Sequence, residues 1–235
     1  MAEVVNCMFN KLTFVAAGAA ILATGLWAQE DTPDHRLRSA ASVFHEMLSA
    51  PDRGIPRDLL EKSQCVIIVP GLKKAGFIFG ADYGKGFAVC RHAGAWTGPA
   101  AITLGGGSFG AQIGVESTDV VMLVMDRKGM EKLASDKFTV GADASVAAGP
   151  VGRTSAADTD ASLHAEILSW SRAHGVFAGV SLDGTVVKKD GGEDRKLYGQ
   201  EVSEHAVLYG DVPPPPAGSI LTAELERYPR EHAQR

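Results

Sequence analysis

Strand-sized apolar runs follow one another along most of the chain, and this pattern limits the fold more than any other feature of the sequence. The runs lie at 65–70, 76–81, 86–91, 100–104, 108–116, 119–125, 138–148, 164–172, 176–182 and 185–190. They contain many β-branched and aromatic residues and end at turn-forming residues, which is typical of strands. Because no long helical pattern separates them, they favour an antiparallel sheet over a doubly wound parallel one. We therefore predict one β-rich α+β domain with a mostly antiparallel sheet, barrel-like as one option, and short flanking helices.

Glycine and proline indicate where these runs should turn. The segment 82–85 (DYGK) lies between two runs and predicts a hairpin. Asp183-Gly184 is the strongest hairpin signal in the chain, because this dipeptide suits a two-residue turn. Pro70-Gly71 should end the run that begins at Cys65.

Helical periodicity is confined to short segments around the strand pattern. An apolar stripe with helical spacing runs from Leu37 to Leu48, and the turn residues at 51–54 end it. Further helices are expected at 56–62, 127–134 and 219–227. The stripe has two interpretations that remain open, a helix that faces the core or a helix that lies on a membrane surface.

The first residues are expected to be removed during export. Lys11 precedes an uncharged run from Leu12 to Ala28, and polar, acidic residues follow at once, as in a secretory signal. An uncleaved membrane anchor is the alternative, although the run is shorter than the roughly 20 residues that span a bilayer. The predicted organisation is a signal peptide at 1–28, a domain at 35–211, and a proline-rich spacer with a short helix and tail at 212–235. The protein is thus expected to be periplasmic or secreted.

Two of the three cysteines would remain after this removal. Cys65 and Cys90 form an even pair in an exported chain, which is compatible with a disulfide. Such a bond would close a loop of about 25 residues and stabilise the fold by roughly 3 kcal/mol. Two buried free thiols are the other interpretation, and the sequence leaves both open.

Charge and composition exclude several classes of function. The formal net charge is −5, so the chain lacks the basic excess of a nucleic-acid-binding protein. The seven histidines are scattered, and no CxxC pair occurs, so we predict no metal site and no cofactor.

A glycine-rich stretch at 105–110 (GGGSFG) matches two catalytic patterns. One is GxGxxG of dinucleotide-binding folds, and the other is GxSxG with Ser108 as the nucleophile. Both patterns need a helix immediately afterwards, and the residues that follow are typical of a strand. We therefore interpret the stretch as a bend with close backbone packing. A serine hydrolase that uses Ser108 stays an unfavoured alternative.

Basic residues occur in small groups along the sequence. Only the tertiary structure decides whether these groups lie together. A group of them on one side could bind an anionic lipid headgroup. The candidate lipid-binding residues are Arg36, Arg38, Lys73, Lys74, Arg127 and Lys128. Lys188-Lys189 and Arg195-Lys196 are further doublets of the same kind.

Several longer motifs resemble those of a known family. They are CVIIVP at 65–70, WTGP at 96–99, GGSFGAQIG at 106–114, GADASVAAGPVGR at 141–153 and GVFAGVSLDG at 175–184. In this order they resemble the SYLF-domain family, also called the Ysc-type actin-binding or lipid-binding domain. The resemblance covers roughly Ser39 to Gly210 and implies a compact β-rich domain without enzymatic activity.

The resemblance also implies which partners to expect. Eukaryotic members are associated with phosphoinositide membranes and actin, and usually carry SH3 or FYVE modules. An exported protein would meet neither actin nor phosphoinositides, so actin is a doubtful partner here. We expect a non-enzymatic binding protein of the cell envelope that binds anionic lipid headgroups at a membrane surface. The alternative is an envelope protein that recognises another protein and has no lipid affinity.

Overall fold

The structure is a computed structural model that describes residues 32–50, 54–150, 165–173, 176–178, 182 and 184–228. The chain divides into two units, Met1–Thr32 and Pro33–Arg235, and the account below concerns the second. The expected signal peptide and Asp183 lie outside the described residues. None of the described helices combines the length and the apolar character that crossing a membrane requires.

Helices form at both ends of the second unit and at one point between its strands. They are α2 (Pro33–Ser49), α3 (Arg57–Lys62), α4 (Arg127–Leu133), α6 (Gly191–Tyr198), α7 (Glu204–Leu208) and α8 (Ser219–Glu226), with a 3-10 turn at Pro216–Gly218. The predicted helices at 56–62, 127–134 and 219–227 are thereby confirmed within two residues. The five-residue helix α7 was not predicted.

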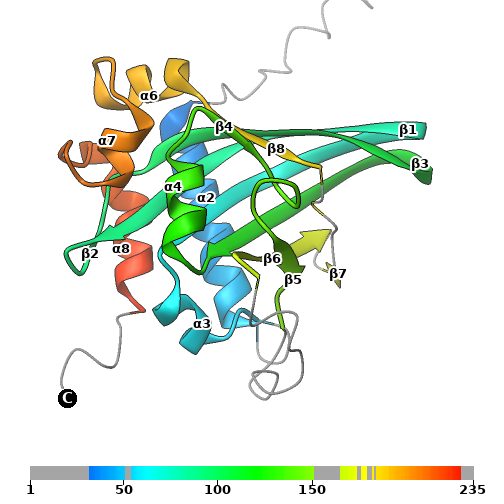
Figure 1. The fold of residues 1–235 in the computed structure, drawn as a ribbon, viewed down its shortest axis with the longest axis horizontal. Coiled ribbons are helices and arrows are strands. Elements are labelled where there is room, and N and C mark those ends of the chain that lie inside the picture. Colours follow the sequence, from blue (N-terminus) through cyan, green and yellow to red (C-terminus); the bar gives the residue numbers. More distant parts are fainter. Residues whose placement is uncertain are drawn as a thin grey trace, which may run out of the picture. The chain divides into compact units, whose positions relative to one another are not determined.

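The strands form one sheet around a long central pair. They are β1 (Cys65–His92), β2 (Ala95–Trp96), β3 (Ala100–Val124), β4 (Lys137–Thr139), β5 (Val146–Ala148), β6 (Ile167–Ala173), β7 (Val176–Ala178) and β8 (Val186–Lys189). β1 and β3 pair antiparallel over most of their length (Figure 1). β6 and β8 flank different halves of β3, and β4 pairs with β8. Only β5 and β6 pair in parallel among the named strands. The predicted α+β fold with a mostly antiparallel sheet is confirmed.

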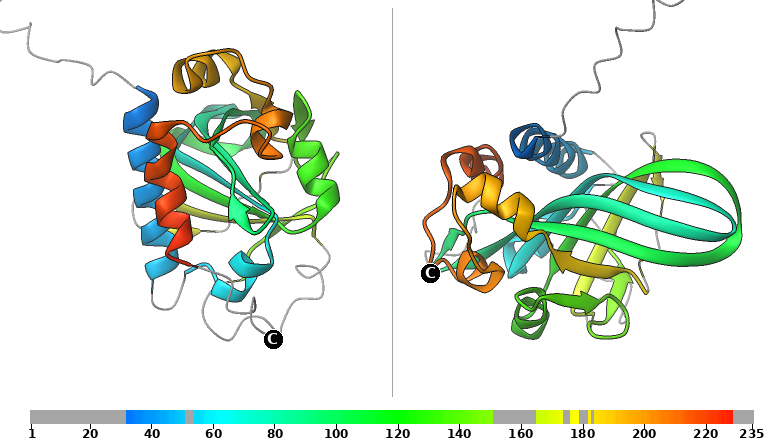
Figure 2. Two further views of the ribbon diagram at one scale, coloured as in Figure 1. Left: turned by 90° about the vertical axis from the view of Figure 1, so that its left-hand side faces the viewer. Right: turned by 90° about the horizontal axis from the view of Figure 1, so that it is seen from above.

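The central pair of strands curls back on itself, as the right-hand view of Figure 2 shows. A Cβ atom on Gly86 would lie 2.1 Å from the carbonyl oxygen of Ile68, so two distant parts of β1 are in backbone contact. A Cβ on Gly84 would lie 2.8 Å from side-chain atoms of Leu72. Only glycine permits so close an approach. A disulfide between Cys65 and Cys90 also joins these two parts of β1.

Two predicted interruptions of β1 are wrong. The segment 82–85 does not turn, because Tyr83 pairs with Gly105 inside a continuous ladder. Its glycine serves the close contact within β1 instead of a hairpin. Pro70-Gly71 does not end the strand either: the register shifts between Val69 and Leu72, and Gly71 has φ +61°. This extra length is a β-bulge, which bends a strand without ending it.

The predicted hairpin at Asp183-Gly184 is also wrong, although a turn is present. Gly184 has φ +80°, and the amide of Thr185 donates to the carbonyl of Leu182 at 2.9 Å. Among the described strands, however, β7 pairs with β6, whereas β8 pairs with β3 and β4. The turn therefore directs the chain across the sheet.

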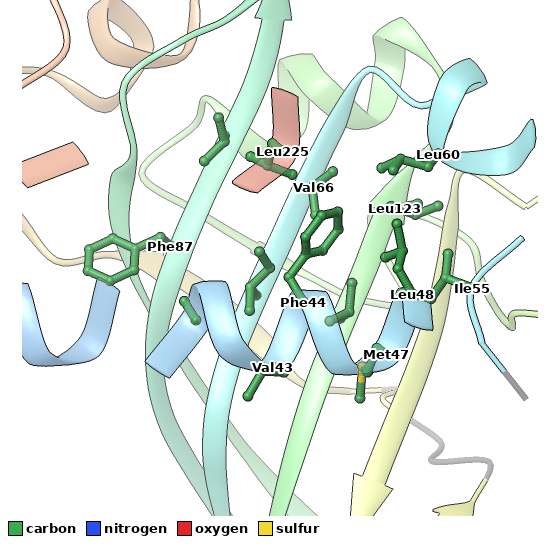
Figure 3. Packing of buried hydrophobic residues seen from close by; sticks show 14 of the residues in the cluster. Val43, Phe44, Met47, Leu48, Ile55, Leu60, Val66, Phe87, Leu123 and Leu225 are labelled. Atoms are coloured by element: carbon green, nitrogen blue, oxygen red, sulfur yellow. The ribbon is translucent and has the colours of Figure 1, made fainter. Parts of the chain in front are cut away.

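The sheet separates two hydrophobic clusters. On one face α2 and α8 lie side by side, and α4 lies on the opposite face (Figure 2, left). Phe44 from α2 and Leu225 from α8 pack against Val66 and Leu123 of the sheet (Figure 3). Since Phe44 is fully buried, the core-facing interpretation of the Leu37–Leu48 stripe is confirmed. The core thus includes α8, the short helix predicted within the segment 212–235.

The other cluster lies beneath α4 and α7. Met130 and Leu133 of α4 and Val207 of α7 pack on strand residues that alternate with those of the first cluster, such as Ile67 and Met122. This alternation explains why the runs at 65–70 and 119–125 are apolar throughout, because both sides of these strands are covered. The groove described next lies beside α4, the helix that covers this cluster.

Candidate anion-binding groove

A groove of about 600 Å³ lies between α4, β4 and the turn that follows β4. Its lining combines three lysines, two carboxylates, a hydroxyl and one aromatic ring. The lining residues are Lys128, Glu131, Lys132, Ser135, Lys137, Phe138 and Asp143. Volumes of this order are typical of small-ligand sites, and charged side chains dominate this one.

Short polar contacts hold the two sides of the groove together. Asp126 caps α4 by accepting a hydrogen bond from the amide of Gly129 at 2.8 Å. The Ser135 hydroxyl oxygen lies 2.6 Å from the carbonyl of Lys132 and 3.1 Å from that of Lys137. The end of α4 is therefore tied to the start of β4, and both lysine-bearing segments are fixed.

One of the three lysines is already neutralised. The ammonium of Lys132 lies 3.4 Å from a carboxylate oxygen of Glu166. The backbone amide of Ser145 donates to the same carboxylate at 2.9 Å, and this bond, followed by Lys132, holds the pKa of Glu166 below its usual value. Lys132 and Glu166 thus form a structural pair that links α4 to the sheet.

Like charges face each other across β4 and β8. The register places Lys137 directly opposite Lys188, and both side chains are exposed. The next lysine, Lys189, is paired with Asp136 at 2.5 Å, which raises its pKa. Among the described residues, neither Lys137 nor Lys188 has a carboxylate within 4 Å. Two like charges opposite each other are unfavourable on a sheet, and an anion bound between them would remove that cost.

The structure distributes the candidate lipid-binding residues over several places. Arg127 and Lys128 belong to α4, and Lys128 lines the groove. Lys73 and Lys74 lie on β1, where Lys73 donates to the hydroxyl of Ser117 at 3.2 Å. The remaining two lie on α2 and are described next.

The two arginines of α2 have different surroundings. Arg38 is exposed. Arg36 is buried and its guanidinium donates to Glu193 at 2.5 Å, so it contributes to the interior. The sequence pattern does not single out Lys132 or Lys137, and it marks Lys188 only as part of a doublet. The pairing of β4 with β8, which places Lys137 opposite Lys188, depends on the whole fold. Single lysines in short strands give no local signal of such pairing.

A second charged cluster lies under α6 and α7. Asp194 is buried and accepts a hydrogen bond from the amide of Ala101 at 2.7 Å. Burial raises the pKa of Asp194 to about 7 and that of Glu204 to about 8, and the charge of Asp194 adds to the shift of Glu204. Burial also raises the pKa of Tyr198, whose hydroxyl donates to the carbonyl of Pro99. These groups are interior and hold the two helices on the sheet.

The geometry does not support the catalytic interpretations of the glycine-rich stretch. Ser108 lies within β3, where its backbone pairs with Gly80, and the strand continues to Val124. A nucleophile elbow and a dinucleotide loop both require a helix at this point. Among the described residues, no group of three or more His, Cys, Asp or Glu side chains is arranged to hold a metal ion.

The curled, mostly antiparallel sheet covered by helices defines a single α+β domain, and a charged groove lies between its α4 and β4. Residues 105–228 match the family model Ysc84, described as "Las17-binding protein actin regulator". The chain belongs to this family, and the resemblance inferred from its motifs is confirmed.

Relatives from yeast and human align with a larger part of the chain than the family model does. LAS seventeen-binding protein 3 of Saccharomyces cerevisiae is 35% identical over 191 residues, which are 80% of this chain and 41% of the relative. SH3 domain-containing YSC84-like protein 1 of Homo sapiens is 31% identical over 205 residues, which are 83% of this chain and 60% of the relative. The chain thus spans about 41–60% of the length of these relatives. The yeast relative is named for binding another protein, and the human relative for its SH3 domain.

Proposed function

We propose that this protein is a non-catalytic binding protein that holds anionic lipid headgroups at a membrane surface of the cell envelope, through the groove between α4 and β4. The observation that carries the proposal is the pairing of Lys137 with Lys188 across β4 and β8, next to the groove that Lys128 and Lys137 line. Two of these lysines face each other across neighbouring strands without a carboxylate partner among the described residues. A phosphate group bound there would supply the missing counter-charge.

Any attraction between this protein and an anionic membrane surface must come from a local group of basic residues, because the whole chain is acidic. The net charge of −5 gives no long-range attraction to an anionic surface. The exposed side chains of Arg127, Lys128, Lys137 and Lys188 supply local positive charge, which acts over about a Debye length. Binding should therefore be sensitive to salt.

Co-sedimentation of the full chain with vesicles tests this function. Phosphatidylcholine vesicles with and without phosphatidylglycerol are compared across a salt series. We expect binding only to the anionic vesicles, lost as salt rises. The variant Lys137→Ala/Lys188→Ala should lose most of this binding, whereas Lys73→Ala/Lys74→Ala, which removes the same charge from β1, should keep it. Equal losses in both variants would contradict a defined site.

A protein partner is the second candidate, and the relatives favour it because their family is named for binding Las17. Absence of binding to every vesicle, together with enrichment of one defined partner that depends on Lys137 and Lys188, would support this function instead.

We also propose that the protein is exported and loses residues 1–28. The uncharged run Leu12–Ala28 after Lys11 supports this proposal. Sequencing the N-terminus of protein recovered from the cell envelope tests it, with Gln29 expected as the first residue. An intact N-terminus would indicate an anchor or an internal protein.

A further inference from the structure

The groove contains negative as well as positive groups. Glu131 lies one helical turn from Lys128 on α4, so both side chains project over the same face. Asp143 stands on the opposite side, where its carboxylate accepts a hydrogen bond from the amide of Thr139 at 2.7 Å. A site built only for an anion would not place two carboxylates in its lining, because they repel the ligand.

The unpaired charges of the groove have both signs. Within the described part of the chain, Lys128 and Lys137 have no carboxylate within 4 Å, and Glu131 has no basic group within 4 Å. Lys132 is excluded from this count because Glu166 pairs with it. Two cations and two carboxylates therefore remain for a ligand.

We infer that the groove binds a headgroup that carries a phosphate and a primary ammonium together, as phosphoserine and phosphoethanolamine do. This inference rests on the proposed function and names the chemical class of its ligand. The phosphate binds Lys128 and Lys137, and the carboxylate of a serine headgroup is directed away from Glu131 and Asp143 toward solvent. The ammonium, which has three donors, binds Glu131 and Asp143.

The remaining lining fits a small headgroup. Phe138 lines the groove with only the small part of its side chain that the core does not cover. The contacts of Ser135 hold α4 and β4 at a fixed separation, so the positive and negative groups are positioned before binding. A headgroup without the ammonium, such as that of phosphatidylglycerol, leaves both carboxylates without a counter-ion and repelled by its phosphate.

Vesicles of equal surface charge test the inference with the full chain. Phosphatidylcholine vesicles carry the same fraction of either phosphatidylserine or phosphatidylglycerol. We expect about fivefold tighter binding to phosphatidylserine, the effect of one exposed charge pair. The variant Glu131→Gln/Asp143→Asn should bind both vesicles equally, through tighter binding to phosphatidylglycerol. The matched control Asp211→Asn/Glu226→Gln changes two exposed carboxylates elsewhere and should keep the preference.

The outcomes separate this inference from the proposed function. Equal binding of the unmodified protein to both vesicles overturns the inference and leaves the proposed function in place. Binding to neither overturns the proposed function. Soluble O-phosphoserine is added as a competitor: displacement of the protein from vesicles supports a headgroup site. If O-phosphoserine binds in a manner that requires Glu131 while vesicles do not, the ligand chemistry stands and its source is a soluble phosphorylated amine.

Discussion

The guanidinium of Arg36 on α2 donates a hydrogen bond to the carboxylate of Glu193 on α6 across 2.5 Å, and both side chains are buried. Two lysines extend this pair. Lys85 on β1 lies 2.6 Å from Asp190 and 3.9 Å from Glu193, and Lys196 lies 3.8 Å from Glu193. The network therefore joins the first helix of the domain to α6 over the edge of the sheet.

Removing one partner of the buried pair should be costly. We expect Arg36→Met to lower the free energy of unfolding by about 3 kcal/mol, because it leaves the carboxylate of Glu193 buried with weaker compensation. Arg36→Met combined with Glu193→Leu should cost less than the sum of the two single changes. Urea unfolding of the three variants measures this coupling, and strictly additive losses would contradict it.

Stability should decline as the pH rises from about 4 to about 8. The pKa values of Asp194 and Glu204 are raised by burial to about 7 and about 8, so both are protonated in the folded protein where they would ionise in the unfolded chain. Their stabilising effect is complete below the unfolded pKa, near 4, and is lost as the pH passes the folded values. The urea midpoint should thus be lower at pH 8.5 than at pH 5.

Two variants check the origin of this decline. Asp194→Asn/Glu204→Gln should flatten the profile between pH 5 and 8.5, because the amides cannot ionise. Glu166→Gln should leave the alkaline decline unchanged, since the pKa of Glu166 is lowered and its contribution is lost at acidic pH instead. A decline that persists in the first variant would place its cause elsewhere.

Helix α8 should behave as part of the core. Leu225 is fully buried in the cluster that contains Phe44. We expect Leu225→Ala to lower the free energy of unfolding by about 2–5 kcal/mol, as for other large-to-small changes in a core. The exposed neighbour Glu226 is the control, and Glu226→Ala should change stability by no more than about 0.5 kcal/mol. Similar small effects from both would mean that α8 is not docked.

The disulfide gives a chemical prediction. With Cys7 replaced by Ser, the denatured, unreduced protein should show no free thiol, and two after reduction. Because the bond spans 25 residues, Cys65→Ala/Cys90→Ala should lose roughly 3 kcal/mol of stability. Two free thiols before reduction would show that the bond does not form in the isolated protein.

The sequence predicted the elements whose signals are local. The stripe from Leu37 to Leu48 repeats over several turns, so α2 could be located, and the strand runs were long and apolar enough to give the fold class. The continuity of β1 could not be predicted, because Gly84 resembles a turn residue until its contact with Leu72 is known. Helix α7 has only five residues, too few to show a helical period.

The sequence predicted only part of the candidate site, because the rest depends on contacts between residues far apart in the chain. Arg127-Lys128 and Lys188-Lys189 stand out as basic doublets, but the position of Lys137 opposite Lys188 follows only from the pairing of β4 with β8. Arg36 looked like a surface residue because its partner Glu193 lies 157 positions away. Contacts at such separations depend on the register of the sheet, which no short window of residues records.

The pairing of β1 with β3 has a kinetic consequence. Partners are 12 positions apart at Ala88 and Ala100, next to the turn, and 59 positions apart at Cys65 and Val124. Loop closure costs more entropy at larger sequence separation. We therefore expect the pairs next to the turn to form first and the more distant pairs to form after them. Cys65 belongs to the last pair of this ladder to meet, so oxidation with Cys90 should follow the rest of the β1–β3 pairing.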